Sequence, residues 1–362
     1  MEFVPAATPL TNSLTAGKLP RRSPLWVLLA GWAVSAAFFT MLFLSGAVDG
    51  FNIVGTVVLG TVLYCVTIYV LSRQVEGSRK AMDRLMTALV TAAFVIALLP
   101  LVSIIYTTAV NGLPAFLTPT FFTESQRNVV GAGGGVLHAV MGTLLVTGVA
   151  TLISVPIGLL TAIYLVEYGR GRLARSITFF VDVMTGVPSI VAGLFAFALF
   201  SLLFDDPGIR FGFGGSIALS VLMIPVVVRS SEEMLKLVPN ELREAAFALG
   251  VPKWLTILKV VLPTSVAGIV TGIMLSIARV IGETAPLLII AGFTASMNYD
   301  MFNDRIMTLP VFVYTQYANQ GADSQAYIDR AWAAALTLVL IVMLLNGIAR
   351  LIAHLFSPKF GR

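Results

Sequence analysis

The sequence predicts an all-α, polytopic membrane protein, and three observations support this fold class. Of its 362 residues, 57% are hydrophobic and only 11% are charged, and the mean hydropathy of +0.92 is far outside the range of soluble globular domains. The apolar residues form long unbroken runs, and a helix needs about 20 such residues to cross a bilayer. Alternating ten-residue segments, which would indicate a membrane β-barrel, are absent from the sequence.

Eight apolar runs are candidates for membrane-spanning helices. They cover residues 25–45, 51–71, 85–110, 136–166, 176–204, 214–230, 264–291 and 331–354. The run at 214–230 is the shortest, and Arg229 blurs its end. We expect residues 1–84, which hold a polar tail, two spans and a basic linker, to be separate from a main part over 85–362 with six spans.

Basic residues predict the orientation of these spans. On one side of the membrane we place 18 of the 23 Lys and Arg residues, namely Lys18, Arg21, Arg22, Arg73, Arg79, Lys80, Arg84, Arg170, Arg172, Arg175, Arg229, Lys236, Arg243, Lys253, Lys259, Arg350, Lys359 and Arg362. The other side holds Arg127, Arg210, Arg305 and Arg330. The positive-inside rule therefore puts both termini in the cytoplasm. The net charge of +5 reflects this topology and does not indicate a nucleic-acid partner.

A charged segment at about 240–263, on the predicted cytoplasmic side, has the pattern of two short amphipathic helices. The first has Leu242, Ala245, Ala246 and Leu249 on one face, at helical spacing. Asn240 is its expected N-cap and Gly250 its expected C-cap. The second is expected to begin at Pro252 and to end at Pro263. Two apolar faces joined at a glycine predict a docking surface for another protein.

Charged residues inside the spans are the candidates for a solute pathway. Arg279 is the only basic residue deep in a predicted span, and Glu283 and Thr284 follow it. At a spacing of four residues, Glu283 would lie on the same helix face as Arg279. One interpretation is a self-neutralising pair that packs the bundle. The other is a pathway site, where a planar guanidinium would suit an oxyanion such as phosphate or sulfate.

The fifth span holds Asp182 and the sequence T-G-V-P-S, which contains Gly186, Pro188 and Ser189. Proline removes a backbone donor, so we expect a kink that frees the carbonyl of Met184. The kink is either purely structural or part of a moving gate. Asp182 is close to the cytoplasmic end of the span, and it either reaches the interface or contributes to the pathway.

Several kinds of chemistry are not supported by the sequence. Cys65 is the single cysteine, and the two histidines, His138 and His354, are placed at opposite faces of the membrane, so no metal site is expected. No G-x-x-x-x-G-K-[ST] motif occurs, and the chain therefore carries no P-loop of its own. We expect no cofactor and no enzymatic activity in this chain.

The charged segment resembles the E-A-A-x3-G-x9-I-x-L-P signature of ABC importer permeases. The matching residues are Glu244, Ala245, Ala246, Gly250, Leu262 and Pro263, and Val260 stands where the signature has Ile. The resemblance implies a type I (MetI-like) permease core, in which this segment forms coupling helices that dock on a separate ATPase subunit.

Further motifs resemble the A-type permease subunits (the PstA family) of phosphate-specific ABC transporters. They are F-F-T at 121–123, Y-L-V-E-Y ending at 168, V-D-V-M-T-G-V-P-S-I-V-A-G at 181–193, A-R-V-I-G-E-T-A-P-L-L at 278–288 and T-L-P-V-F-V-Y at 308–314. The resemblance implies an inner-membrane complex with a second, C-type permease, a B-type ATPase dimer and an extracytoplasmic phosphate-binding protein. It also implies alternating access, with Arg279 in the pathway.

The resemblance covers residues from about 85 to the end, and the two N-terminal spans have no counterpart in the family pattern. Three other functions stay open. The chain could be a permease for sulfate or molybdate, a channel or secondary transporter that needs no ATPase, or a scaffold that carries no solute.

Overall fold

The computed structural model describes residues 17–20, 22–45, 50–321 and 323–356, and within these ranges the chain is helical, without β-strands. Seven of the described helices are long and apolar enough to cross a membrane, and α5 with α6 would make an eighth if that bent pair is one span. The predicted fold class is confirmed, and each predicted span has a helical counterpart. Most of the expected N-terminal tail, and the turn at Asp49, lie outside the described residues.

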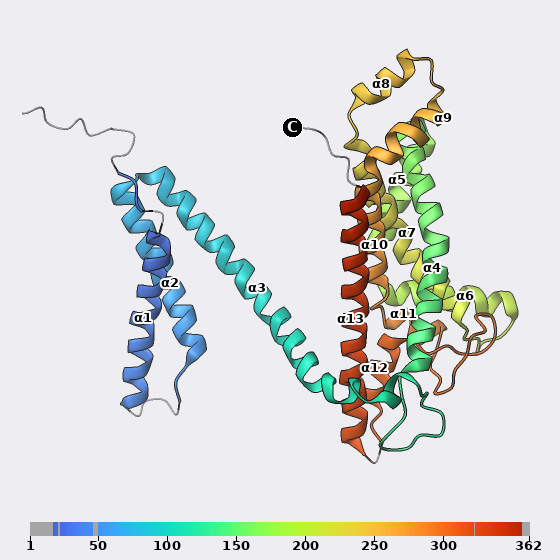
Figure 1. The fold of residues 1–362 in the computed structure, drawn as a ribbon, viewed down its shortest axis with the longest axis horizontal. Helices are drawn as coiled ribbons and strands as arrows, with labels where there is room; N and C mark the ends of the chain where they lie inside the picture. The colour runs from blue at the N-terminus through green and yellow to red at the C-terminus, as the bar shows by residue number, and fades with distance from the viewer. Residues whose placement is uncertain (1–16, 21, 46–49, 322, 357–362) are drawn as a thin grey trace, which may run out of the picture. The chain divides into compact units, whose positions relative to one another are not determined.

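The chain divides into two compact units, and the division along the sequence falls between Ile105 and Tyr106. The first contains α1 (Ser23–Leu44), α2 (Ile53–Val75) and most of α3 (Ser78–Phe116). The second contains the rest, in which η1 is a 3-10 turn and η2 and η3 are π-helical turns: η1 (Pro119–Phe122), α4 (Leu137–Ile163), η2 (Tyr164–Tyr168), α5 (Gly171–Thr185), α6 (Ser189–Phe204), α7 (Gly212–Lys236), α8 (Asn240–Ala248), α9 (Lys253–Thr256), η3 (Ile257–Val261), α10 (Leu262–Val280), α11 (Ala285–Ile290), α12 (Leu309–Ala318) and α13 (Ser324–Phe356). Within the second unit, α8 and α9 lie at one end of the bundle and α12 at the other (Figure 1).

In the first unit, α1 and α2 approach closely at two glycines. A Cβ atom added to Gly31 would lie 2.8 Å from the carbonyl oxygen of Gly60. Such small residues let helix backbones pack closely in membranes. The basic linker expected between α2 and the next span is largely helical, because α3 already begins at Ser78. The division of the sequence at residue 84 stays a prediction.

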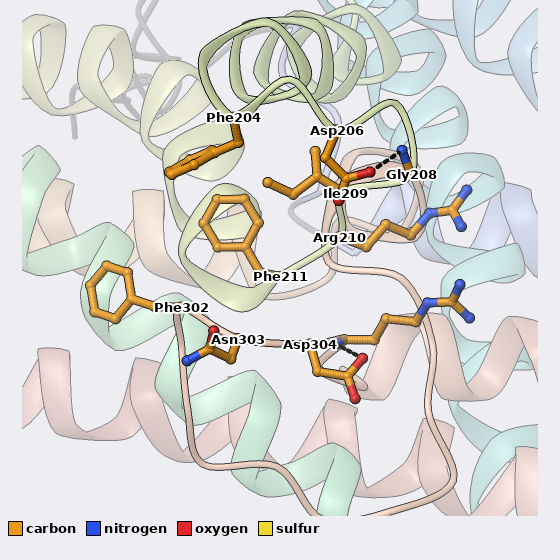
Figure 2. Close-up of a pocket in the computed structure, with 10 residues that line it drawn as sticks. Phe204, Asp206, Gly208, Ile209, Arg210, Phe211, Phe302, Asn303 and Asp304 are labelled. Carbon is orange, nitrogen blue, oxygen red and sulfur yellow. Dashed lines mark hydrogen bonds between the residues drawn. The ribbon is translucent and has the colours of Figure 1, made fainter.

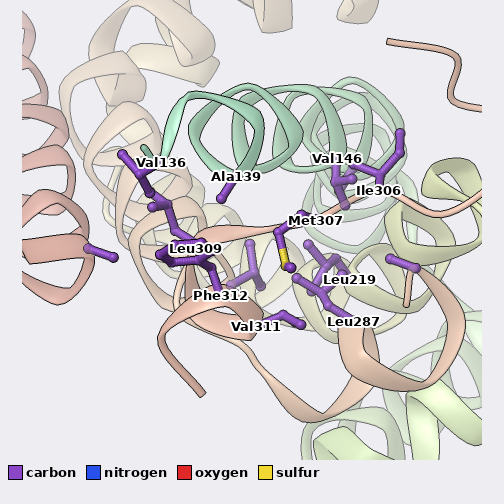
Figure 3. Close-up of a cluster of buried hydrophobic side chains, with 14 of the residues drawn as sticks. Val136, Ala139, Val146, Leu219, Leu287, Ile306, Met307, Leu309, Val311 and Phe312 are labelled. Atoms are coloured by element: carbon purple, nitrogen blue, oxygen red, sulfur yellow. The ribbon is translucent and has the colours of Figure 1, made fainter. Parts of the chain in front are cut away.

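The core of the second unit lies around α4 and α7. The hydroxyl of Ser216 in α7 donates to the carbonyl of Val146 in α4 at 2.9 Å, and the hydroxyl of Thr143 accepts the N–H of Leu309 at 2.7 Å. Buried apolar side chains of α4, α7, α11 and α12 fill the space between these helices (Figure 3). Together these contacts fix the start of α12 on α4.

The span expected to be the shortest is the most enclosed helix of the second unit. α7 runs for 25 residues, and 67% of its apolar window is buried, a larger share than in any other candidate span of the described chain. Small residues such as Gly215, Ser216 and Ser220 permit close packing on α4 but contribute little hydropathy. For this reason the apolar run looks short, although the helix is long.

Candidate coupling and substrate-path sites

A buried ion pair anchors α8 to the rest of the bundle. The Nε of Arg243 donates to Oε1 of Glu167 at 3.0 Å, and its two terminal nitrogens donate to the carbonyls of Val238 at 2.6 Å and Leu235 at 3.0 Å. The two charged side chains are only 13% and 6% exposed. Lys253 in α9 also donates to the backbone carbonyl of Glu167. The π turn η2 therefore holds both helices of the segment.

The C-cap of α8 is Leu249, and Gly250, the predicted C-cap, is the next residue. Its φ is +76°, in the left-handed region that favours glycine, and the N–H of Val251 donates to the carbonyl of Ala246 at 3.1 Å. The N-cap prediction is wrong, because Asn240 is the first residue of the helix. Its side chain instead accepts a hydrogen bond of 3.3 Å from Arg243.

The apolar face expected on α8 is divided between the core and the surface. Leu242 packs on an inner cluster and Ala246 is buried, whereas Leu249 is 83% exposed. On the following helix, Trp254 is 58% exposed. The exposed residues of the segment include Glu244, Ala245, Phe247, Leu249, Gly250, Trp254 and Leu258. One side of α8 thus fixes the segment to the bundle, and apolar side chains remain accessible on the other.

The second helix of the segment was expected to end at Pro263, but in the structure it continues past this residue. Helix α9 continues through η3 into α10, so Lys253–Val280 forms one helical span of 28 residues. Leu262 and Pro263 are the first residues of α10. Pro263 therefore lies inside a continuous span, where it has no N–H to donate, and the π turn directly before it changes the hydrogen-bond register. The coupling segment is therefore continuous with the helix that carries Arg279.

The predicted seventh span is broken directly after Arg279. Helix α10 ends at Val280, and α11 begins at Ala285, so Glu283 and Thr284 lie in a non-helical link. The expected helical pair is wrong, since Arg279 and Glu283 do not share a helix and form no ion pair in the described structure. Pro286 has no N–H to donate to the carbonyl of Gly282, which explains why the helix does not continue.

Arg279 is exposed in the last turn of α10, and its side chain has no hydrogen-bond or ion-pair partner among the described residues. Glu283 and Thr284 are half-buried beside it in the chain. Non-helical backbone at membrane depth is tolerated where it is buried in protein or lines a polar cavity. Discontinuous helices form the solute sites of several transporter folds.

The fifth predicted span is also broken, more sharply than the expected kink. Helices α5 and α6 meet at 108°, with Gly186 and Pro188 in the bend and Ser189 as the first residue of α6. The carbonyl of Met184 is not freed, because it accepts the N–H of Val187 at 3.2 Å. Gly186 and Pro188, whose ψ of 139° is extended, lie where α5 ends, so α5 and α6 are two separate helices and not one kinked helix.

The two breaks are brought together through α6 and α11. A Cβ atom added to Gly193 in α6 would lie 2.5 Å from Cα of Pro286 in α11, so the two helices touch at this point. Ser189 lies one turn before Gly193. Of the predicted pathway residues, the structure thus places Arg279, Glu283, Thr284 and Ser189 on two broken helices that pack against each other.

Asp182, in α5, belongs to a charge network that could not be recognised in full from the sequence, and its place in the pathway stays a prediction. Its carboxylate pairs with Arg229 of α7, which also contacts Glu232 at 2.8 Å, and Glu232 in turn contacts Lys236 at 2.7 Å. Asp182 and Arg229 are 47 residues apart in sequence, so only the Arg229–Glu232–Lys236 part of the network could have been recognised from helical spacing. The described residues contain no cluster of His, Cys, Asp and Glu suited to a metal ion.

A helical bundle with two broken spans and a protruding helical segment defines a multi-pass membrane protein of the permease class. The model of the family "binding-protein-dependent transport system inner membrane component" matches residues 154–362. The chain is 46% identical over 294 residues to "Phosphate transport system permease protein PstA 1" of Mycobacterium tuberculosis, which covers 80% of this chain and 94% of that protein. It is 39% identical to the PstA permease of Yersinia pestis, over 77% of this chain and 92% of the other.

A solved structure of a bacterial alginate ABC transporter, in complex with an alginate-bound periplasmic protein, contains a chain with the same fold. The TM-score is 0.51 at 13% identity, and the match covers 78% of this chain and 97% of that one. The chain belongs to the family of binding-protein-dependent transport system inner membrane components, and within it to the PstA permeases.

Proposed function

We propose that this chain is the membrane-spanning permease subunit of an ATP-driven importer of inorganic phosphate. Its relatives are named phosphate transport system permease proteins, and this supports phosphate as the cargo. Its partners would be a second, C-type permease, a dimer of B-type ATPase subunits and an extracytoplasmic phosphate-binding protein. The complex would lie in the bacterial plasma membrane, with both termini of this chain in the cytoplasm.

The observation that carries this proposal is the α8–α9 segment. It is tied to the bundle by Arg243 and Glu167, and it exposes Leu249 and Trp254. Exposed apolar side chains on a short, anchored helix suit the groove of a partner protein. Since the sequence has no P-loop, the ATPase must be that partner.

The mechanism follows from the continuity of α9 with α10. Closure of the ATPase dimer on ATP moves the α8–α9 segment, and α10 transmits the movement to the break after Val280. There Arg279 stabilises the phosphate in passage, because a guanidinium offers an oxyanion two parallel charged hydrogen bonds. Glu283, Thr284 and Ser189 lie near the same breaks and complete this chain's share of the pathway.

The test is uptake of labelled phosphate by proteoliposomes that contain this chain with its proposed partners. We expect uptake that requires the ATPase, ATP and the loaded binding protein, and that an excess of sulfate or molybdate does not compete with. Competition by either anion would reassign the cargo. Uptake without the ATPase would indicate a channel or secondary transporter, and a complex that assembles without any uptake would indicate a scaffold.

A further inference from the structure

A pocket of about 680 Å³ lies between the end of α6, residues 206–211 and the loop at 302–305 (Figure 2). Two of its lining residues are Arg210 and Arg305, which the sequence places on the extracytoplasmic side, opposite to α8 and α9. Nothing in the coupling mechanism uses either arginine. They are 95 residues apart in sequence, and the fold brings them to one site.

Both arginines are held by the end of α11. The Nε of Arg210 donates to the carbonyl of Ile289 at 3.2 Å, and the neighbouring Phe211 N–H donates to the carbonyl of Ile290 at 2.9 Å. The N–H of Ile306, next to Arg305, donates to the carbonyl of Ala291 at 3.1 Å. Three successive carbonyls, of Ile289, Ile290 and Ala291, thus fix the two loop segments that carry the arginines. The same short helix begins at the break beside Arg279.

Gly292 brings the two side chains together. Its φ of +74° suits glycine, and a Cβ atom there would lie 3.0 Å from Cδ of Arg210 and 3.1 Å from Cγ of Arg305. The aliphatic stems of both arginines therefore lie against one residue that has no side chain. An anion between the two guanidinium groups would offset the repulsion between their like charges.

The acidic residues of the pocket do not neutralise the arginines. One oxygen of Asp206 accepts the N–H of Gly208 at 2.8 Å, and one oxygen of Asp304 accepts the N–H of Arg305 at 2.7 Å, as the dashed lines in Figure 2 mark. Neither carboxylate forms an ion pair with an arginine in the described part of the chain. The terminal nitrogens of Arg210 have no partner among the described residues, so the guanidinium is available to a ligand.

We propose that Arg210 and Arg305 together form a binding site for a phosphate-type oxyanion at the outer end of α11. The pair offers two charged, planar donors to one tetrahedral anion. The role of this site in transport rests on the proposed function: it receives the anion before Arg279 does. The same chemistry would fit a dissolved phosphate ion or the headgroup of a phospholipid, and the experiment separates the two.

The first measurement is thermal unfolding of the full-length chain, purified in a phosphate-free detergent and titrated with inorganic phosphate or with a short-chain phosphatidylglycerol. At about 100 times its Kd, inorganic phosphate should raise the Tm by roughly 5 °C. The rise should be lost in the double variant Arg210→Gln, Arg305→Gln and retained in Arg127→Gln, which removes an exposed arginine outside the pocket on the same predicted side. The double lysine variant, which keeps both charges, should unfold at the temperature of the original chain without ligand.

The second measurement is phosphate uptake by the assembled complex. Each single glutamine variant should raise the phosphate concentration for half-maximal uptake by roughly tenfold, the loss expected for one charged hydrogen bond. Arginine-dependent protection by the lipid alone would assign the oxyanion to a headgroup and remove the site from the transport path. Protection by neither ligand, or protection unchanged in the double variant, would overturn the proposal. A complex that carries no phosphate at all would contradict the proposed function, and the Tm titration would still decide whether the site exists.

Discussion

Charged residues at the two ends of the helical span Lys253–Val280 are arranged in opposite ways. Lys253, at its first end, donates to the carbonyl of Glu167, and there Arg243 and Glu167 are paired and nearly buried, with Arg243 also donating to two backbone carbonyls. At the other end, Arg279 is exposed, and no described residue pairs with it. One helix therefore connects a neutralised charge pair to an unpaired cation.

The difference between the buried Arg243–Glu167 pair and the unpaired Arg279 indicates two different roles for these charges. A buried pair fixes geometry, because separating its members would leave a charge without compensation in an apolar environment. An unpaired cation at a helix break keeps its hydrogen-bonding capacity for a ligand. The end of the span that joins α8 and α9 thus has a fixed geometry, and the break after Arg279 is suited to exchange of an anion.

The largest expected effect comes from breaking the buried pair. Arg243→Gln leaves the carboxylate of Glu167 unpaired and should lower the free energy of unfolding by about 3 kcal/mol. Thermal unfolding of the purified chain measures this loss. The matched control is Lys236→Gln, which removes a cation that is 61% exposed and should cost less than about 1 kcal/mol. Equal losses in free energy of unfolding in the two variants would show that the buried Arg243–Glu167 pair stabilises the fold no more than an exposed pair does.

At the other end, removal of the unpaired cation should affect transport and leave the fold intact. Arg279→Gln is expected to lower phosphate uptake by at least roughly tenfold, since it removes a charged hydrogen bond to the anion, with the unfolding temperature unchanged. Arg279→Lys keeps the charge without the planar fork and should recover part of the uptake. Full uptake by an assembled Arg279→Gln complex would exclude this residue from the pathway.

A smaller loss is expected from substitutions of Gly250, which test the rigidity of the end that joins α8 and α9 without changing a charge. A Cβ atom at this position meets nothing within 4 Å, so the cost arises from the left-handed backbone and should be about 1–2 kcal/mol for Ala. Asn should cost less than Ala, and Val more. In the assembled complex, Gly250→Val should uncouple ATP hydrolysis from phosphate uptake. The variant Glu244→Lys, at an exposed position of α8, should have the same effect. Normal hydrolysis stimulated by the binding protein in both variants would count against coupling through this segment.

The last expected effect is a pH dependence, and it concerns an ion pair in the first unit. Arg84 contacts Glu76 at 2.6 Å, and this pairing lowers the pKa of Glu76 from 4.5 to about 2. A depressed carboxyl pKa stabilises the fold above pH 4.5, and the stabilisation is lost as the pH falls toward 2. The unfolding temperature of the chain should therefore fall over this range, and Glu76→Gln should remove that part of the fall. An identical pH profile in the variant would mean that the pair contributes nothing to stability.

Hydropathy predicted helix for each candidate span, two of which the structure breaks, and the amphipathic pattern at 240–263 predicted the helices α8 and α9. The breaks were harder to predict. Pro188 predicted a kink, whereas Pro286 was not recognised as an interruption, because the choice between a continuous helix, a kink and a break depends on packing, such as that of Gly193 on Pro286. A proline inside α7, Pro225, leaves that helix unbroken.

Contacts between distant residues could not be read from one sequence. Arg243 and Glu167 are 76 residues apart, and the Y-L-V-E-Y motif gave no indication of a role for its glutamate. The pairing of Arg210 with Arg305 depends likewise on the fold of two loops. Helical spacing predicts neighbours within one helix, but it carries no information on which helices meet.

The π turn η3 has a mechanical consequence. Lys253–Val280 forms a helical rod roughly 40 Å long, and η3 lies near the end formed by α9. A π turn holds one residue more than an α-helical turn, so its conversion to α-helix would rotate all later residues by about 100° about the rod's axis. Torsion applied at α9 would then reach Arg279 as a change in the direction of its side chain, accompanied by a lengthening of the helix by about one residue's rise, roughly 1.5 Å.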